Sequence, residues 1–294
     1  MLEIVYLLHA DYGKPSDAIS FFSNVSSLTK NLQAEISFTC LAKGFSNGEF
    51  GAVNTDFNIV HVPNIGRDIY SYMYISTKSR SDFLMFFNTS SKVCSVDFFS
   101  SALEQLGRHN CGAISATGSS ASIISSKYFS NLATLTESQS FLVGVSKSLL
   151  AGVGEFGARV YGYRPVTHLR TNAFGISREK FTSLINMLRK VPKSRFESLC
   201  FESGETGMSS LLRRNGQSIL VMDKFGQDYN VNCWLSSRTY CSHGQSGLAV
   251  KDNRTAEYHE GDLNMKRKLF IGAWCNTDYF DLNIRKKSQL DQHL

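Results

Sequence analysis

Residues 2–9 read LEIVYLLH, a nearly unbroken apolar run that is typical of a strand buried on both faces of a sheet. The next segment, SDAISFFSNVSSLTK at 16–30, repeats its apolar residues at roughly helical spacing, and AEISFTCL at 34–41 predicts a second strand. A strand, a helix and a strand in this order form a βαβ unit, in which the two strands are parallel. This opening stretch therefore predicts an α/β protein.

The alternation of strand and helix continues to about residue 117. Further strands are predicted at 57–62 (FNIVHV), 83–88 (FLMFFN) and 112–117 (GAISAT), and Asp68 and Ser95 are placed to cap the helices between them. Repeated units of this kind predict a mostly parallel central sheet with helices on both faces. Ligands in such proteins bind at the carboxyl ends of the strands.

Clear periodicity returns in the second half of the chain. A helix is predicted from Ser177, another from about Glu205 to Arg214, and a strand at 218–222 (SILVM). The sequence contains no internal repeat, and 294 residues are compatible with one large domain. We therefore expect a single domain over residues 1–294.

The composition is that of a globular protein, with 42% hydrophobic and 19% charged residues. The net charge of +6 is spread along the chain without an interleaved aromatic stripe, which argues against nucleic acid as a partner. The seven cysteines form no CxxC pair and are expected to be reduced thiols, not disulfides or metal ligands. The sequence shows no signal-peptide pattern and no apolar run of membrane-spanning length, so we expect a cytoplasmic protein.

Three polar segments follow predicted strands and are expected to meet at the carboxyl edge of the sheet. These segments are residues 9–13, 63–68 and 88–91. In the second, Gly66 permits close backbone approach and Arg67 supplies a cation before a helix start, which suits a phosphate group. The alternative is that Asp68 only caps the helix and that Arg67 is a solvated surface residue.

Two carboxylates, Glu202 and Glu205, are expected at the start of the helix that ends near Arg214. There they would interact favourably with the helix dipole, or one of them could act as a general base facing a cleft. A polar cluster before the predicted Ser177 helix either binds a substrate or satisfies a loop; it comprises His168, Arg170, Thr171 and Asn172. The GxSxG, HExxH, P-loop and GxGxxG motifs are absent, so the corresponding hydrolase, zinc-protease and nucleotide-binding functions lack support.

Five segments carry a resemblance to a known group of enzymes: VPNIGRD at 62–68, FLMFFNTSS at 83–91, HLRTNAFGISREKF at 168–181, FESGETGMSSLLRRNGQSILV at 201–221 and QSGLAVKDNRTAEY at 245–258. Together they resemble bacterial glycosyltransferases of the GT-A fold that build O-antigens, lipopolysaccharide and related surface polysaccharides, including rhamnan-synthesis proteins. The resemblance covers most of the chain through short motifs. It implies a GT-A-like, Rossmann-like fold.

The resemblance also implies an activity. The chain is expected to be an inverting, nucleotide-sugar-dependent hexosyltransferase, with dTDP-L-rhamnose as the leading donor and UDP-sugars second. Residues 1–117 would bind the nucleotide sugar, and residues 118–294 would bind the acceptor, a growing glycan on a lipid carrier. Such an enzyme works at the inner face of the cytoplasmic membrane, with peripheral association, either alone or as one module of a larger protein beside other glycosyltransferase modules.

The same resemblance assigns roles to individual residues. It places the general base at Glu202, with Glu205 as the alternative. It places the donor against Asp11, Asn64, Gly66, Arg67, Asp68, Asn88, Thr89 and Ser90, although Asp11 is equally well explained as a turn residue. It places the acceptor against His168, Arg170, Thr171 and Asn172.

One departure from the group concerns metal. Where many GT-A enzymes carry an Asp-x-Asp motif that holds a divalent ion, this chain has Asn88, Thr89 and Ser90. Neutral side chains are poor ligands for hard cations. We therefore expect metal-independent catalysis without a cofactor, in which Arg67, backbone N–H groups and Arg170 meet the charge of the leaving group. The alternative is Mg²⁺ or Mn²⁺ held elsewhere.

Two other functions stay open at this stage. A GT-A-like module that binds carbohydrate or nucleotide within a polysaccharide synthase, without catalysis, would also lack the Asp-x-Asp motif. A nucleotidyltransferase of related architecture would need an acidic metal pair and a glycine-rich phosphate loop, and the sequence shows neither.

Overall fold

The computed structural model of the chain describes residues 1–46, 48–50, 56–120, 167–188 and 190–274. Its centre is an eight-stranded sheet with the strand order β11-β10-β6-β9-β4-β1-β2-β3. The strands are β1 (Leu2–His9), β2 (Ile36–Lys43), β3 (Asn58–Val62), β4 (Phe83–Phe87), β6 (Cys111–Ser115), β9 (Ala173–Ser177), β10 (Ser218–Met222) and β11 (Asp228–Tyr229). Two short antiparallel pairs accompany it, β5 (Lys92–Val93) with β12 (Val250–Lys251) and β7 (Gly118–Ser119) with β8 (His168–Leu169).

Most strands of this sheet run in the same direction. β1 pairs in parallel with β2 and β4, β2 with β3, and β10 with β6. β9 is antiparallel to both of its neighbours, β4 and β6, and β11 is antiparallel to β10. The predicted α/β class with a mostly parallel sheet is confirmed. The reversed β9 between β4 and β6 is a feature that the strand–helix alternation did not predict.

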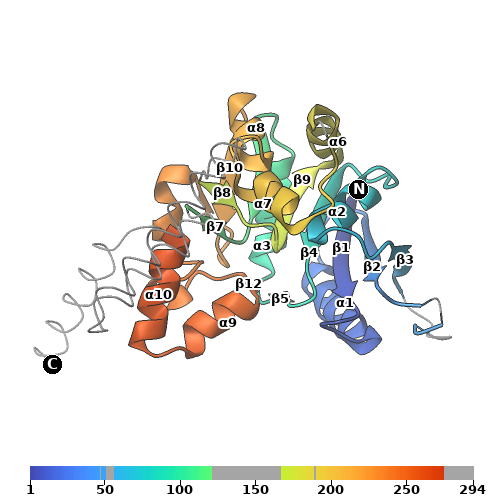
Figure 1. Cartoon of the computed structure of the whole chain (residues 1–294), viewed down its shortest axis with the longest axis horizontal. Coiled ribbons are helices and arrows are strands. Elements are labelled where there is room, and N and C mark those ends of the chain that lie inside the picture. The colour runs from blue at the N-terminus through green and yellow to red at the C-terminus, as the bar shows by residue number, and fades with distance from the viewer. Residues whose placement is uncertain (47, 51–55, 121–166, 189, 275–294) are drawn as a thin grey trace, which may run out of the picture.

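Helices cover both faces of the sheet, and each face has its own hydrophobic core (Figure 1). On one face pack α1 (Pro15–Thr29) and α3 (Asp97–Leu106); on the other pack α2 (Asp68–Ser76), α6 (Arg178–Met187), α7 (Arg195–Ser203) and α8 (Met208–Arg214). The alternation of side chains along β1 shows why both faces are apolar. Val5 and Leu7 enter one core, while Ile4, Tyr6 and Leu8 enter the other.

The chain after β10 adds a C-terminal group of helices. It consists of the 3₁₀ helices η1 (Val231–Ser237) and η2 (His243–Gln245) and the α-helices α9 (Asn253–Glu260) and α10 (Leu263–Trp274). Figure 1 shows α10 at one end of the molecule and the strands β2 and β3 at the other. In the part of the chain that is described, no helix has the length and apolar character needed to cross a membrane.

Helix α7 was not predicted, and it changes the position of Glu202. Ser194 starts α7 with a capping box, because its hydroxyl accepts from the N–H of Glu197 and the Glu197 carboxylate accepts from the N–H of Ser194. After α7 the chain turns at Gly204, where a Cβ would lie 2.4 Å from the carbonyl oxygen of Cys200. The helix predicted from Glu205 therefore begins only at Met208. Glu202 lies in the last turn of α7, not at a helix start.

The structure agrees with some of the predicted helix caps and not with others. Ser177 caps α6 as expected, since its hydroxyl accepts from the N–H of Lys180 at 3.3 Å. Ser95 lies one residue before the cap position of α3, which Val96 holds, but its hydroxyl does accept from the N–H of Phe98 at 3.2 Å. Asp68 does not cap α2: it is the first helical residue, Arg67 holds the cap position, and no side chain bonds there. The carboxylate of Asp68 is therefore left for another role.

Candidate functional site

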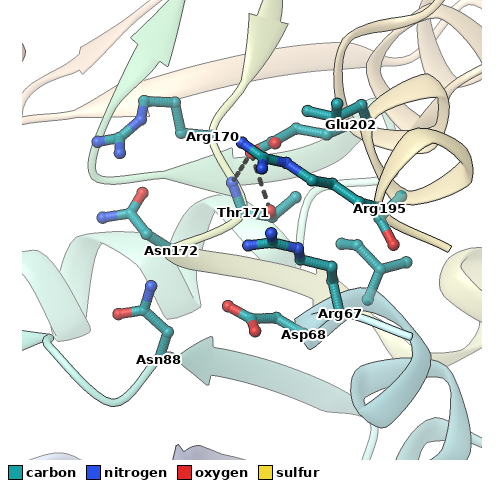
Figure 2. A pocket seen from close by; sticks show the side chains of 11 residues that line it. Arg67, Asp68, Asn88, Arg170, Thr171, Asn172, Arg195 and Glu202 are labelled. Atoms are coloured by element: carbon teal, nitrogen blue, oxygen red, sulfur yellow. Dashed lines mark hydrogen bonds between the residues drawn. The ribbon is translucent and has the colours of Figure 1, made fainter. Parts of the chain in front are cut away.

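A pocket of about 230 Å³ opens at the carboxyl edge of the parallel strands. Four segments form its walls: the start of α2, the end of β4, the segment before β9 and one face of α7. Figure 2 shows the side chains that line it. They are Arg67, Asp68, Ile69, Asn88, Arg170, Thr171, Asn172, Arg195, Ser198, Leu199 and Glu202.

The reversed direction of β9 brings two of these segments together. Phe87 at the end of β4 pairs with Ala173 at the start of β9. Just beyond this pair, the N–H of Asn88 donates to the carbonyl oxygen of Asn172 at 3.1 Å. The segment before β9 therefore lies at the edge of the sheet where the parallel strands end.

Glu202 is held in the pocket by Thr171. One carboxylate oxygen, Oε1, accepts from the backbone N–H of Thr171 at 2.8 Å and from its hydroxyl at 2.9 Å (Figure 2). No hydrogen bond joins the second oxygen, Oε2, to any described residue. The helix dipole disfavours a carboxylate at a C-terminal turn, so the dipole does not explain this position. The structure thus presents a fixed carboxylate with one oxygen available to a ligand.

A buried ion pair anchors the residues on either side of Thr171. Asp252 Oδ2 accepts from Arg170 Nη1 at 2.9 Å and from Asn172 Nδ2 at 2.7 Å, and its side chain is 5% exposed. The Arg170 guanidinium also lies 4.1 Å from the ring centre of Tyr240. Burial lowers the pKa of Arg170, but the surrounding acidic groups, among which Asp252 contributes most, together raise it above its ordinary value. The charge of Arg170 is therefore neutralised within the protein.

A buried lysine fixes the loop that leads into α2. Lys43, at the end of β2, is 1% exposed, and its Nζ donates to the carbonyl oxygens of Ile65, Gly66 and Arg67 at 3.0, 2.9 and 3.1 Å. Gly66 has φ +61°, and a Cβ there would lie 3.0 Å from the carbonyl oxygen of Pro192. The glycine is required by both conformation and space. Lys43 and Gly66 together set where Arg67 is presented.

Asp68 is the second carboxylate of the pocket. Burial raises its pKa, Lys43 opposes this effect, and the charge of Glu202 adds to the rise. In Figure 2 the side chains of Asp68 and Asn88 lie on the same side of the pocket, away from Glu202. The pocket therefore carries two carboxylates that interact electrostatically across it.

Two arginines of the pocket lack an ion-pair partner among the described residues. Arg67 and Arg195 are both exposed, and Figure 2 shows their side chains extending into the same space from α2 and α7. Neither Arg195 nor α7 was predicted from the sequence. The signal was the Ser194-x-x-Glu197 capping box, which would have placed Arg195 and Glu202 on one helical face.

Three of the expected donor residues lie at the β4 end. Asn88 lines the pocket, and its Oδ1 accepts from Ser90 N at 3.3 Å and Ser91 Oγ at 3.0 Å. Thr89 ties this end to β1, since its hydroxyl accepts from the N–H of His9 at 3.0 Å. Thr89 and Ser90 line a neighbouring pocket of about 490 Å³. The predicted meeting of the loops after β1 and β4 is thus observed.

Seven of the expected site residues do not line the Glu202 pocket; Gly66, Thr89 and Ser90 are described above, and the other four lie elsewhere. Asp11 is in an exposed turn, where its N–H donates to Nδ1 of His9 at 3.2 Å. Asn64 is exposed. His168 is 4% exposed on β8. Glu205 forms an ion pair with Arg214 at 3.0 Å, outside the pocket.

The residues at the β4 end do not fit a dedicated divalent-cation site. The described residues contain no group of three or more His, Cys, Asp or Glu side chains placed to hold a metal ion. The amide oxygen of Asn88 already accepts two hydrogen bonds, and that of Asn172 accepts from the Thr117 hydroxyl at 3.1 Å. We therefore derive no catalytic step through a metal.

Comparison with known proteins gives only distant structural similarity. No protein family matches the chain, and no curated protein is similar to it in sequence. A mannosyltransferase from Pyrobaculum calidifontis, solved with GDP-Man and Mn²⁺, aligns over 81% of this chain and 59% of its own, with 8% identity and a TM-score of 0.44. The chain therefore spans less than two thirds of that protein.

Two further solved structures illustrate the range of similar proteins. Glucosyl-3-phosphoglycerate synthase from Mycobacterium tuberculosis, solved with Mn²⁺, UDP and phosphoglyceric acid, aligns over 74% of this chain and 66% of its own, with 13% identity and a TM-score of 0.40. A CMP:2-keto-3-deoxy-manno-octonic acid synthetase aligns over 74% and 87%, with 11% identity and a TM-score of 0.39. We base the functional proposal on the site itself.

Proposed function

We propose that the protein is an inverting glycosyltransferase that uses a nucleoside-diphosphate sugar, with Glu202 as the general base. The observation that carries this proposal is the pocket at the carboxyl edge of the sheet. In it, Thr171 fixes one oxygen of Glu202, while two arginines without ion-pair partners among the described residues stand nearby. A fixed carboxylate, with arginines nearby that form no ion pair among the described residues, suits proton removal beside an anionic leaving group.

The reaction follows from these groups. An acceptor hydroxyl attacks the anomeric carbon from the face opposite the nucleotide, and its proton passes to Glu202. The new bond joins the acceptor oxygen to the anomeric carbon, while the bond from that carbon to the phosphate oxygen breaks. The nucleoside diphosphate leaves with the electron pair. General-base catalysis of this kind contributes typically ~10²- to 10⁴-fold in rate.

Arg67 is proposed to bind the diphosphate. Arg67 is the residue before α2, so it lies beside the free N–H groups of the helix N-terminus, and Lys43 donates hydrogen bonds to the carbonyl oxygens of the loop that contains Arg67. A guanidinium can form two parallel hydrogen bonds to a phosphate group. In this proposal the leaving-group charge is met by Arg67 and backbone donors, so transfer does not depend on a divalent ion.

The finer substrate assignment rests on the sequence motifs. Their resemblance to surface-polysaccharide glycosyltransferases supports L-rhamnose from dTDP-L-rhamnose as the sugar, with UDP-sugars second. It also supports a lipid-linked glycan as acceptor, at the inner face of the cytoplasmic membrane, and assembly with other glycosyltransferase modules. The donor would bind to the half at 1–117 and the acceptor to the half at 118–294.

A second candidate function is supported by the β4 end. Because Asn88, Thr89 and Ser90 stand where many GT-A enzymes carry acidic residues, a module that binds a sugar nucleotide without turning it over is also consistent with the chain. This candidate predicts nucleotide binding, no sugar transfer and no functional effect of Glu202→Gln.

Nucleotide binding provides the first test. Thermal unfolding of the purified protein is followed with dTDP, UDP, GDP and CMP, each with and without EDTA. A ligand at 100 times its Kd adds ~2.7 kcal/mol of stability. We expect a selective rise in Tm with dTDP or UDP, and we expect it to persist in EDTA. The rise should be lost in Arg67→Gln and retained in the control Arg214→Gln, whose arginine pairs with Glu205 outside the pocket. No shift with any nucleotide would contradict the proposal, and a shift abolished by EDTA would contradict metal independence.

A further inference from the structure

Arg195 occupies the first position of α7 without contributing to the start of that helix. The helix start is stabilised by Ser194 and Glu197, which form the capping box. The Glu197 carboxylate also accepts from Lys190 Nζ at 2.7 Å and from the N–H of Lys193 at 2.8 Å. The acid closest to Arg195 in the sequence is therefore already paired with other groups.

The helix dipole does not account for a cation at the position of Arg195. A helix N-terminus carries partial positive charge, so a cation in its first turn is disfavoured. Among the described residues, none forms an ion pair with Arg195. An anion bound in the pocket would compensate both the guanidinium and the helix end.

Arg195 shares its helical face with the proposed base. Arg195, Ser198, Leu199 and Glu202 have the spacing i, i+3, i+4 and i+7, and all four line the pocket. The Cα atoms of Arg195 and Glu202 are separated by about two turns, or ~10.5 Å along the axis. Long side chains from both ends of this face can reach one ligand that lies along α7.

The other pocket arginines are accounted for differently. Arg170 is neutralised by Asp252. Arg67 belongs to the loop after β3, among the strand-end loops proposed to hold the donor. Arg195 is the pocket arginine on the helix of the proposed base, and the base must contact the acceptor.

We propose that Arg195 binds a carboxylate or phosphate group on the acceptor, so that the enzyme glycosylates an acidic sugar. This inference rests on the proposed function of Glu202. A guanidinium forms bidentate, charge-assisted hydrogen bonds to either anion. Binding the acid group at Arg195 orients the acceptor along α7 and directs one of its hydroxyls to Glu202. A uronic acid and a sugar phosphate are the two sources of such a group.

The test compares three small sugars. Methyl β-D-glucuronide, glucose 6-phosphate and methyl β-D-glucoside are titrated, with and without saturating UDP or dTDP, while binding is measured by saturation-transfer NMR. We expect binding of the glucuronide or the phosphate, and weaker or no binding of the glucoside. The arm that binds identifies the acid group.

Two variants assign the binding to Arg195. Loss of a charge-assisted bond should weaken binding of the acidic sugar about tenfold or more in Arg195→Gln. The surface control Arg214→Gln, whose arginine pairs with Glu205 outside the pocket, should retain it. Unchanged thermal midpoints would show that the variants are folded.

Several outcomes would overturn the inference. These are equal binding of acidic and neutral sugars, no binding of any of the three, or unchanged binding in Arg195→Gln. Loss of the nucleotide-induced Tm shift in Arg195→Gln would assign Arg195 to the donor instead. Failure of the proposed function is distinguishable, because it would abolish the nucleotide shift or the sugar transfer of the wild type, whereas Arg195-dependent binding of an acidic sugar needs neither.

Discussion

Replacing Asp252 by asparagine would separate two roles of one carboxylate. Asp252 caps α9, because its Oδ1 accepts from the N–H of Thr255 at 2.8 Å. Its other oxygen accepts from Arg170 at 2.9 Å and from Asn172 at 2.7 Å. Asparagine caps helices about as well as aspartate does, so Asp252→Asn keeps the cap and removes the charge that neutralises Arg170.

The expected cost follows from the burial of the pair. Removing one partner of a buried ion pair costs about 3–5 kcal/mol, because the other charge is left uncompensated. The Arg170 side chain is 17% exposed and can recover some hydration, so we expect the lower end, about 3 kcal/mol. Asp252→Ala should cost about 1 kcal/mol more, because it also removes the cap.

Denaturant-induced unfolding measures these differences. Wild type, Asp252→Asn, Asp252→Ala, Arg170→Met and the double variant Asp252→Asn/Arg170→Met form a cycle. Since the double variant removes both charges, it should be more stable than the sum of the single effects predicts, by about 0.5–3 kcal/mol. We also expect lower kcat in Asp252→Asn, because the segment that holds Glu202 through Thr171 loses its anchor. An unfolding free energy within about 0.5 kcal/mol of wild type, the size of a typical surface change, would refute this reasoning.

Three further predictions concern single residues of the site. Burial raises the pKa of Asp68 above its ordinary value of 3.8, so the folded state loses stability as the pH rises and Asp68 ionises. Asp68→Asn should therefore unfold at a higher denaturant concentration than wild type at pH 7, and this difference should shrink below about pH 4. An equal difference at both pH values would contradict the prediction. Lys43→Met removes the donor to three carbonyl oxygens, so it should lower the free energy of unfolding by about 1–3 kcal/mol and weaken nucleotide binding. Unchanged nucleotide affinity would show that Lys43 does not position Arg67. Thr171→Val keeps the N–H donor to Glu202 but loses the hydroxyl, so kcat should fall with little change in KM, whereas Thr171→Ser should retain kcat. Equal kcat values in the two variants would contradict a positioning role for the hydroxyl.

The first half of the fold could be predicted because its signals are local. The apolar run at β1, the spacing in α1 and the strand at 83–88 each specify their element without reference to the rest of the chain. Parallel strands place the loops after them at one edge of the sheet, and this rule correctly placed Arg67, Asp68 and Asn88 at the site. The insertion of β9 could not be predicted in this way, because it depends on pairing with two strands far apart in the sequence.

The misassigned parts of the site have specific causes. Glu202 was expected at a helix start because the glycines that follow it, Gly204 and Gly207, and the capping box at Ser194 were not used to place α7. The segment at 245–258 carried part of the resemblance but assigned no role to Asp252, whose partners Arg170 and Asn172 lie about 80 residues earlier. The capping box was a local signal for α7, whereas the long-range ion pair is revealed only by the assembled fold.

The central claim is that Glu202 removes a proton during sugar transfer, and one comparison tests it directly. Release of nucleoside diphosphate from dTDP-L-rhamnose and from UDP-sugars is measured with the acidic and neutral acceptor sugars for wild type, Glu202→Gln and the matched control Glu205→Gln. Glu205 forms its ion pair with Arg214 outside the pocket. We predict that Glu202→Gln, still folded and still stabilised by the nucleotide, loses ~10²- to 10⁴-fold in kcat, whereas Glu205→Gln stays close to wild type. Near wild-type turnover by folded Glu202→Gln would contradict the account.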